Sequence, residues 1–531
     1  MRLQPSVAEV MMPSPALAPA PQAAREARSK RGLRPTLIAV SVAALWLSGC
    51  AIKPTPFTDA ERVQNAHAER TAMFANQPPL TGPVTLEEAM ARAIRYNLDH
   101  RLKMMEEALA QKQLDVANFD MLPRLTAAAG YTNRSHPLAS ESISLQTHQV
   151  SLEPSYSTDQ NDRTADLTFS WNVLDFGVSY FEAKEQADRV LVVEQRRRKV
   201  VQLMMQQVRE AYWEAVGAQR LESRVGPLLA QAKQALDESR QSQREGLRSP
   251  LDTLGYQHAL LDIMRQLEAV RDQLDEAKPR LASLMNIAPG TEITLAPPEA
   301  FTVPSFDMPM DRMEETALER RPELVEASYN ERISVNETHK AIAKLLPGIE
   351  FQLGSHYDSN SFLAYHAWRA AGINVSWNLL NLLNAKNIRG MANAQHEVAR
   401  AQQLALSMAV LTQVHVARTE FGAKQRQFDL YKQINDVDGQ ILQHTHNATV
   451  ASAQGKLEEI RAATSAMMSE LRLYQSYGEL ESAYGQLLAT LGLDPLPADA
   501  GQGDLKSIEQ SIDKEQTRWA AFGHADGVKT Q

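Results

Sequence analysis

Residues 167–173, LTFSWNV, alternate strictly between apolar and polar side chains. Successive side chains of a β-strand point to opposite faces of the sheet, so this pattern predicts a strand with one apolar and one polar face. We place the strand at about residues 165–174. Helical patterns lie on both sides of it, so the chain is predicted to be mainly α with a small β part.

Three further segments favour strands. A weak alternation covers about residues 124–132, and clearer ones cover about 348–356 and 372–380. The alternation assigns a face to each side chain. The apolar face includes Phe169, Trp171, Val375 and Trp377, which would face lipid if the strands belonged to a transmembrane barrel. The polar face includes Ser170, Asn172, Ser376 and Asn378, which would then line the lumen.

Long stretches between the strands have the periodicity of coiled coils. Apolar residues recur by threes and fours over about 180–245 and 251–286, which predicts two long helices. A further helix is expected from Thr85, a plausible N-cap, to about Met121. The apolar stripes predict helix packing and no cofactor site.

The order of these elements occurs twice. The Leu-Pro pair at 122–123 recurs at 346–347, SWN at 170–172 recurs at 376–378, and LASL at 281–284 returns as LATL at 488–491. Each copy reads helix, strand, loop, strand, long helix, break, long helix. A duplication of this size determines the architecture more strongly than any single motif.

Composition excludes several classes of protein. The formal net charge of −9 argues against general nucleic-acid binding. A single cysteine excludes a disulfide scaffold and a Cys-rich metal site. His444 and His446 diverge at i and i+2 on a helix, so they predict no metal site. With no motif for zinc, phosphate or a serine nucleophile, we expect no enzyme, no cofactor and no metal.

The N-terminal region is typical of a secretory signal. Basic residues between 25 and 34 precede the apolar run 36–47, which is too short to span a membrane. The run ends in Leu47, Ser48, Gly49 and Cys50. This sequence resembles the bacterial lipoprotein box, which implies lipidation of Cys50. Ala51, in place of Asp, implies an outer-membrane address. The translation start is left open between Met1, Met11 and Met12.

Taken together, the duplication, the helix–Leu-Pro–strand junctions and the run SWNVLDFGVSYFEAKEQAD from Ser170 resemble the outer membrane efflux (TolC-like) family, in its lipoprotein branch. The resemblance covers about residues 84–495. The second repeat departs from it with Asn381 and Leu382, where the first has Asp175 and Phe176.

The resemblance implies a homotrimeric channel in the outer membrane of a Gram-negative bacterium. Each protomer would give four strands to a shared barrel of twelve strands and its long helices to a tunnel in the periplasm. Such a channel serves a tripartite efflux or type I secretion system as a passive duct. Its partners would be a periplasmic adaptor protein and an inner-membrane pump, with outer-membrane lipid bound through acylated Cys50.

On this reading the chain divides into six segments. They are a lipoprotein signal peptide (1–49), a lipid-anchored extended arm (50–84), a first efflux-channel repeat (85–290), a connector (291–310), a second repeat (311–495) and a polar C-terminal tail (496–531).

The resemblance also implies a periplasmic tip at the two helix breaks, of the form Gly-x-x-Ser/Thr-x-x-Asp. The first break supplies Gly246, Ser249 and Asp252, with Arg248 between them. The second supplies Gly455, Glu458 and Arg461, so that Glu458 replaces the hydroxyl residue and Arg461 replaces the Asp. Which of these residues form a gate is left open.

Two alternatives remain at this point. The strands alone also suit a small soluble sheet packed on the helices, and the whole chain also suits a lipid-anchored periplasmic coiled-coil scaffold without a pore. The exported substrate and the class of pump, proton-driven or ATP-driven, do not follow from the sequence.

Overall fold

A computed structural model describes residues 54–150, 153–245, 249–297, 300–451, 455–494 and 503–522. The chain divides into two compact units, Met1–Glu69 and Arg70–Gln531. Helix α2 (Asp59–Met73) begins in the first unit and buries none of its residues. The remaining elements belong to the second unit.

Long helices dominate the second unit. Its helices are α3 (Leu86–Tyr96), α4 (Leu98–Phe119), α5 (Val173–Arg244), α6 (Pro250–Leu284), α7 (Met310–Arg320), α8 (Pro322–Ala343), α9 (Leu379–Leu383), α10 (Ala385–Ala451), α11 (Lys456–Thr490) and α12 (Leu505–Phe522). Helices α5 and α10 have 72 and 67 residues, and each is about 100 Å long at 1.5 Å per residue. None of the described helices combines the length and apolarity that crossing a bilayer requires.

The predicted helix from Thr85 to Met121 is two helices. Thr85 caps α3 as expected, because its hydroxyl accepts the Glu88 backbone N–H at 3.1 Å. The prediction of one continuous helix was wrong at Asn97. The Asn97 side chain accepts the backbone N–H groups of Asp99 and His100, so α4 begins there with a cap of its own.

Four strands form one antiparallel sheet in the order β1-β4-β5-β6. Their bounds are β1 (Arg124–Asn133), β4 (Asn161–Asn172), β5 (Gly348–Asp358) and β6 (Ala367–Ser376). A small hairpin of β2 (Ala139–Ser140) and β3 (Ser155–Tyr156) lies in the segment between β1 and β4. The two repeats join where β4 pairs with β5, with Phe169 opposite Leu353 and Trp171 opposite Phe351.

The last strand differs from its predicted range of 372–380. It begins at Ala367 and ends at Ser376, and residues 379–383 form the short helix α9. The alternation of Leu379 with its neighbours suggested a continued strand. Asn378 prevents this, since its side chain accepts the Leu380 backbone N–H at 3.2 Å and starts a helix.

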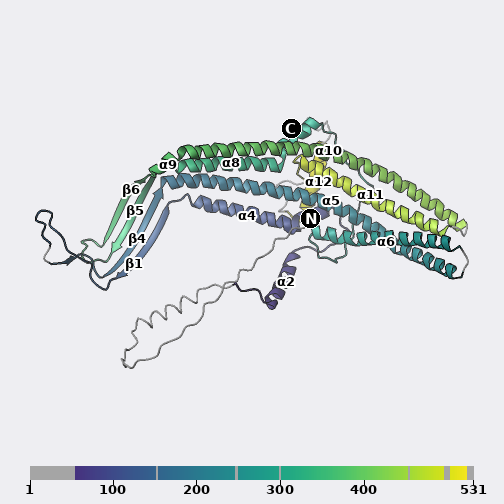
Figure 1. Ribbon diagram of the computed structural model, residues 1–531, viewed down its shortest axis with the longest axis horizontal. Coiled ribbons are helices and arrows are strands. Elements are labelled where there is room, and N and C mark those ends of the chain that lie inside the picture. Colours follow the sequence, from purple (N-terminus) through teal and green to yellow (C-terminus); the bar gives the residue numbers. More distant parts are fainter. Residues whose placement is uncertain are drawn as a thin grey trace, which may run out of the picture. The chain divides into compact units, whose positions relative to one another are not determined.

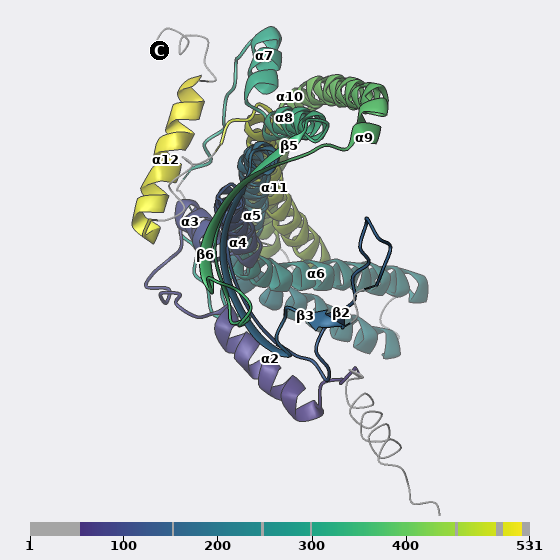
Figure 2. The same ribbon diagram turned by 90° about the vertical axis from the view of Figure 1, so that its left-hand side faces the viewer.

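Helices and strands share one lateral order. Helix α4 packs on α5, α5 on α8, and α8 on α10. Chain continuity joins α4 to β1, β4 to α5, α8 to β5, and β6 through α9 to α10. The helical layer therefore continues the sheet strand by strand (Figure 1). The sheet itself is a curved strip (Figure 2).

Away from the sheet, α5, α6, α10 and α11 pack together around an apolar core. Leu260 and Leu267 of α6 and Leu480 of α11 are fully buried there. An aromatic cluster closes one part of this core. It contains Trp213, Phe301, Phe428 and Tyr477.

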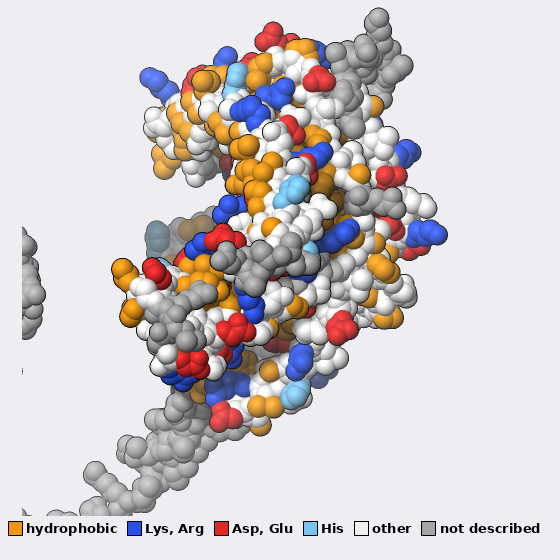
Figure 3. Space-filling view, turned by 90° about the vertical axis from the view of Figure 1, so that its right-hand side faces the viewer, with side chains coloured by type: hydrophobic (Ala, Val, Ile, Leu, Met, Phe, Trp, Pro, Cys, Tyr) orange, Lys and Arg blue, Asp and Glu red, His pale blue; other side chains and the backbone are white. Residues whose placement is uncertain are grey.

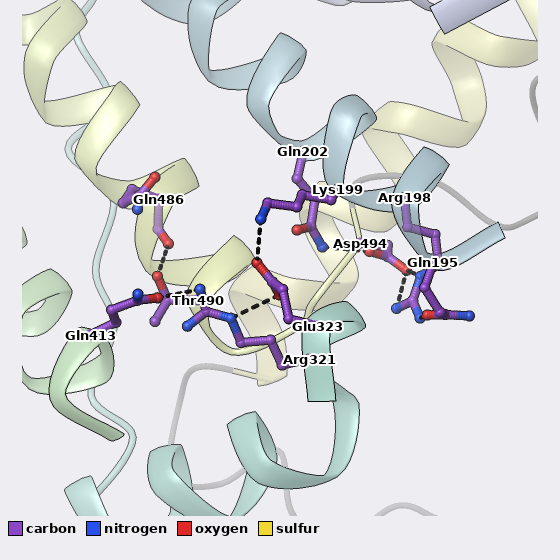
Figure 4. A network of polar contacts seen from close by, with 10 residues as sticks. All are labelled: Gln195, Arg198, Lys199, Gln202, Arg321, Glu323, Gln413, Gln486, Thr490 and Asp494. Atoms are coloured by element: carbon purple, nitrogen blue, oxygen red, sulfur yellow. Dashed lines mark hydrogen bonds and ion pairs between the residues drawn. The ribbon is translucent and has the colours of Figure 1, made fainter. Parts of the chain in front are cut away.

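A polar network fixes the junction of α7 and α8 against α5, α10 and α11 (Figure 4). Arg321 donates to Glu323 at 3.0 Å and to Gln413, while Lys199 approaches Glu323 at 3.2 Å. The backbone approaches closely nearby. A Cβ on Gly492 would lie 2.5 Å from the Arg320 carbonyl, so a glycine is required there, also by its φ of +72°.

Candidate functional site

The two faces of the sheet differ in polarity and exposure. In β4 and β5 every odd-numbered side chain is exposed. This outer face includes Leu167, Phe169, Trp171, Ile349, Phe351, Leu353 and Tyr357. The even-numbered side chains of β4 are all half-buried. Side chains converge on the concave side of a curved sheet, so we assign this inner face to the concave side.

The inner face carries most of the charge of the sheet. By register its charged and titratable residues are Arg124, Asp162, Asp166, Glu350, His356 and Asp358. The remaining inner positions of β4 are threonine, serine and asparagine. Here the apolar side chains are exposed and the polar ones are half-buried, which is the reverse of a sheet in a soluble protein. Such an arrangement suits a wall between lipid and water.

The predicted face residues lie at the helix end of the sheet. Phe169 and Trp171 are on the outer face, where the Trp171 ring contacts Phe176 and Phe351. Ser170 and Asn172 are on the inner face and half-buried. The Asn172 side chain also accepts the Leu174 backbone N–H at 2.9 Å and so caps α5.

The second set of these residues straddles the end of β6. Val375 is exposed and Ser376 is the last strand residue. Trp377 and Asn378 follow the strand, so their assignment to strand faces was wrong. The Trp377 indole N–H donates to the Leu345 carbonyl at 2.9 Å, and Asn378 caps α9. The repeated SWN motif thus encodes helix caps, which an Asn before a helical pattern signals.

Both lateral edges of the layer are open in the single chain. Among the described strands of this sheet, β1 pairs only with β4 and β6 only with β5. The helices beside these edges expose apolar side chains. They include Leu102, Met105 and Leu109 of α4 and Leu404, Met408 and Val416 of α10.

The first predicted tip break is described only in part. Gly246 and Arg248 lie outside the described residues. Ser249 precedes α6 and its carbonyl accepts both the backbone N–H and the hydroxyl of Thr253. Asp252, in the first turn of α6, lines a cleft of about 370 Å³ together with Glu238 of α5.

The second break begins α11 at Gly455, whose φ of +138° favours glycine. Glu458 and Arg461 pair with each other at 2.8 Å. Sequence reasoning missed two further contacts: His446 with Glu459 at 2.7 Å and Lys456 with Glu238 at 3.3 Å. The Lys456 pair joins the two repeats and has no local sequence signal.

The ends of α5 and α10 and the beginnings of α6 and α11 lie away from the sheet (Figure 1). Viewed onto this end, basic, acidic and apolar side chains are intermixed on the surface (Figure 3). The ion pairs at the second break are exposed, and such pairs each contribute little to stability.

A buried ionic cluster joins α5 to α8 near the sheet. Lys340 donates to Glu182 at 2.5 Å and to Glu185 at 2.8 Å. Burial raises the pKa of Glu185, whose side chain is inaccessible to solvent. The hydrogen bond from Lys340 lowers the pKa of Glu182. Burial by itself lowers the pKa of Lys340, but its hydrogen bonds to both carboxylates outweigh this and raise it.

The predicted lipobox, Leu47, Ser48, Gly49 and Cys50, lies outside the described residues, as does the signal peptide. Among the residues that are described, no three His, Cys, Asp or Glu side chains gather closely enough to hold a metal ion.

The comparisons with known proteins agree with this architecture. Residues 98–286 match the family model described as Outer membrane efflux protein. No curated protein matches the chain significantly. Three solved structures that share the fold are outer-membrane channels.

The CmeC outer membrane channel of Campylobacter jejuni has a TM-score of 0.60 and 12% identity, over 88% of this chain and 97% of that one. The MtrE outer membrane channel of Neisseria gonorrhoeae, in its open state, has a TM-score of 0.57 and 16% identity, over 77% and 88%. The outer-membrane channel OprN has a TM-score of 0.56 and 19% identity, over 77% and 89%. Residues 98–286 therefore match the outer membrane efflux protein family, and the chain as a whole has the fold of these outer-membrane channels.

Proposed function

We propose that three copies of this chain form an outer-membrane channel that acts as a passive duct for efflux from the periplasm to the outside. The observation that carries this proposal is the polarity of the sheet. In the central strands β4 and β5, the exposed outer face carries the large apolar side chains, and the inner face is half-buried or buried and mostly polar. An exposed apolar face is unfavourable in water, and a polar face is unfavourable in lipid. The sheet therefore fits a wall with lipid outside and water inside.

The open edges support a closed ring of copies. A sheet edge in lipid leaves backbone N–H and C=O groups unpaired, at a cost of several kcal/mol per group. The β6 edge of one copy and the β1 edge of the next satisfy each other in a head-to-tail arrangement, which closes into a ring. The exposed apolar side chains of α10 and α4 then meet at the same seam.

We take the number of copies from the family. Three copies give a barrel of twelve strands, and their long helices give a tunnel that extends into the periplasm. Cys50 anchors each copy to the outer membrane through its acyl chains, and the two helix breaks form the periplasmic tip. The channel receives its cargo from an inner-membrane pump through a periplasmic adaptor. The fold that this chain shares with the CmeC and MtrE outer membrane channels supports the proposal that it forms a channel.

Electrical recording from planar bilayers tests the proposal. The purified full-length protein is expected to run as a trimer in unboiled samples and to conduct ions in discrete steps. A protein that stays monomeric and gives no conductance contradicts the channel and favours the scaffold without a pore.

Access from outside the cell gives a second test. If the strands span the membrane, protease added to intact cells cleaves sites engineered into the β1–β4 loop at 134–160 or the β5–β6 loop at 359–366. A site engineered next to Gly455, at the proposed periplasmic tip, is the matched control and stays protected. Equal protection of all three sites contradicts the topology.

The anchor is tested separately. Cys50→Ser is expected to abolish incorporation of labelled palmitate and to leave the mobility of any assembled trimer unchanged. Labelling that persists in this variant contradicts an anchor at Cys50, because the chain has only this cysteine.

A further inference from the structure

Helix α9 exposes four leucines in little more than one turn. It connects the sheet to α10 (Figure 1), its sequence is LLNLL, and none of its residues is buried. Leu380 and Leu383 are 74% and 80% exposed. Leucines gathered in this way are unfavourable in water, so we expect something other than water to cover them.

The turn has an apolar side and a polar side. At about 100° per residue the four leucines occupy an arc of roughly 160°, and Asn381 and Asn384 lie on the remaining arc. The first repeat has no such face after its SWN motif. There the corresponding segment is 173–177, with Asp175 in the place of Asn381 and Gly177 in the place of Leu383.

The charges beside α9 are positive. Residues 359–396 contain no Asp or Glu, and their charged residues are Arg369, Lys386 and Arg389. Lys386 and Arg389 are exposed in the first turns of α10, directly after α9. An apolar helix face with basic residues next to it is typical of a helix that lies in the surface of a membrane, where lipid phosphates attract the basic side chains.

The sheet beside α9 has a short apolar band on its outer face. Counted from the helix end, three consecutive rows of β5 and β6 are apolar: Ile349 with Val375, Phe351 with Ile373, and Leu353 with Ala371. The next row pairs Ser355 with Arg369. Three rows cover about 13 Å at about 3.3 Å per residue, whereas the apolar band of a transmembrane barrel is about 25 Å tall. Because Arg369 ends the band on one side, its extension must lie beyond the helix end of the strands, where α9 follows.

We propose that α9 lies in the periplasmic leaflet of the outer membrane, with its leucines among the lipid tails, and completes the lipid-facing surface of the second repeat. This rests on the proposed function, because it requires the outer face of the sheet to contact lipid and the long helices to extend into the periplasm. Trp377, between β6 and α9, and Trp171, at the helix end of β4, are both exposed. Aromatic side chains are enriched where a barrel meets the membrane interface, which agrees with this depth.

Spin labels on introduced cysteines test the environment of α9. The background is Cys50→Ser, which leaves no native thiol, and the labelled protein is placed in vesicles of phosphatidylethanolamine and phosphatidylglycerol. Leu383→Cys carries a label on the leucine side of the turn. Asn381→Cys is the matched control on the polar side, and Phe169→Cys is the reference for the outer face of the sheet.

Electron paramagnetic resonance measures how often each label collides with oxygen, which concentrates among lipid tails, and with a polar nickel chelate, which stays in water. The ratio of oxygen to chelate collisions is expected to be several-fold higher for the Leu383→Cys label than for the Asn381→Cys label. It is expected to resemble the ratio of the Phe169→Cys label. Trimer content in unboiled samples shows that each variant has assembled before it is measured.

The outcomes separate this inference from the channel itself. A Leu383→Cys label that collides mainly with the chelate lies in water, and one shielded from both reagents lies against another copy, whose α4 exposes Val116 and Phe119. Either result, or equal ratios for the two labels on α9, overturns the inference and leaves the channel standing, provided that the Phe169→Cys label reports lipid. A Phe169→Cys label in water overturns the lipid-facing wall and the inference together.

Discussion

The helical part and the sheet place their apolar side chains on opposite sides. In α6, Leu260 and Leu267 are fully buried, and the charged side chains of Asp262 and Arg265 between them are exposed. In β5, Phe351 and Leu353 are 39% and 56% exposed, while the polar Gln352 between them is half-buried. The core of the helical part and the sheet thus follow opposite rules, which supports the proposal that the outer face of the sheet contacts lipid.

The largest loss of stability is expected from a substitution in the core of the helical part. Phe428 is buried in the aromatic cluster, where its ring contacts Phe301 and Tyr477. Phe428→Ala is expected to destabilise the fold by about 3–5 kcal/mol, through lost burial and a cavity. Thermal unfolding in detergent measures this. An unchanged midpoint contradicts a packed core at this position.

The sheet offers the converse test. Phe169→Arg places a charge on the outer face near the helix end of β4. A basic residue on the lipid face of a barrel costs about 2–4 kcal/mol at the bilayer midplane and about 0–1 kcal/mol near the interfaces, so a cost between these values is expected. Insertion into lipid vesicles is expected to fall accordingly. Ser170→Arg, the adjacent position on the inner face, is the matched control and is expected to insert. Equal insertion of both variants breaks the distinction between the two faces.

A smaller effect is expected where the two regions meet. Asn172→Ala and Asn378→Ala each remove a helix cap at the end of a strand, worth about 1 kcal/mol. Replacement by Asp keeps an accepting oxygen and is expected to restore most of the loss. Urea unfolding of the detergent-solubilised protein measures both. Failure of Asp to rescue stability assigns these residues a role other than capping.

The smallest change in stability is expected for Glu185 and Glu182, the two carboxylates that accept hydrogen bonds from Lys340. For these residues the test is the sign of the pH dependence of stability. The pKa of Glu185 is raised by burial, so its contribution to stability is present at acidic pH and is lost as the pH rises through that pKa. Glu185→Gln is therefore expected to gain stability relative to wild type at about pH 8 compared with about pH 4.

Glu182 behaves in the opposite way. Its pKa is lowered by the hydrogen bond from Lys340, so its contribution is present above its unfolded pKa and lost as the pH falls. Glu182→Gln is expected to lose stability at neutral pH and nothing in acid. Melting temperatures of both variants across this range check the signs, and the same sign for both contradicts the assignment.

Much of the architecture was predictable because it depends on periodicity. The alternation over 167–173 predicted β4, and coiled-coil spacing predicted α5 and α6 within a few residues at most ends. The duplication predicted the order of elements. Such patterns depend on residues that are close in the sequence, and the packing of helices and strands into one layer requires them.

The errors arose where one polar side chain outweighs a pattern. Asn97 divides a helix that the periodicity makes continuous, and Asn378 ends a strand that the alternation extends. Contacts between distant segments carried no signal either. Lys456 and Glu238, or His356 and Asp166, are brought together only by the lateral order of the layer.

The junctions between strands and helices have a mechanical consequence. Helix α5 begins at Val173, immediately after β4 ends at Asn172, so no connecting residue separates β4 from α5 in this repeat. In the other repeat, α9 and the turn at Asn384 separate β6 from α10. We therefore expect a torque applied at the far end of the helices to reach the sheet more directly along α5 than along α10.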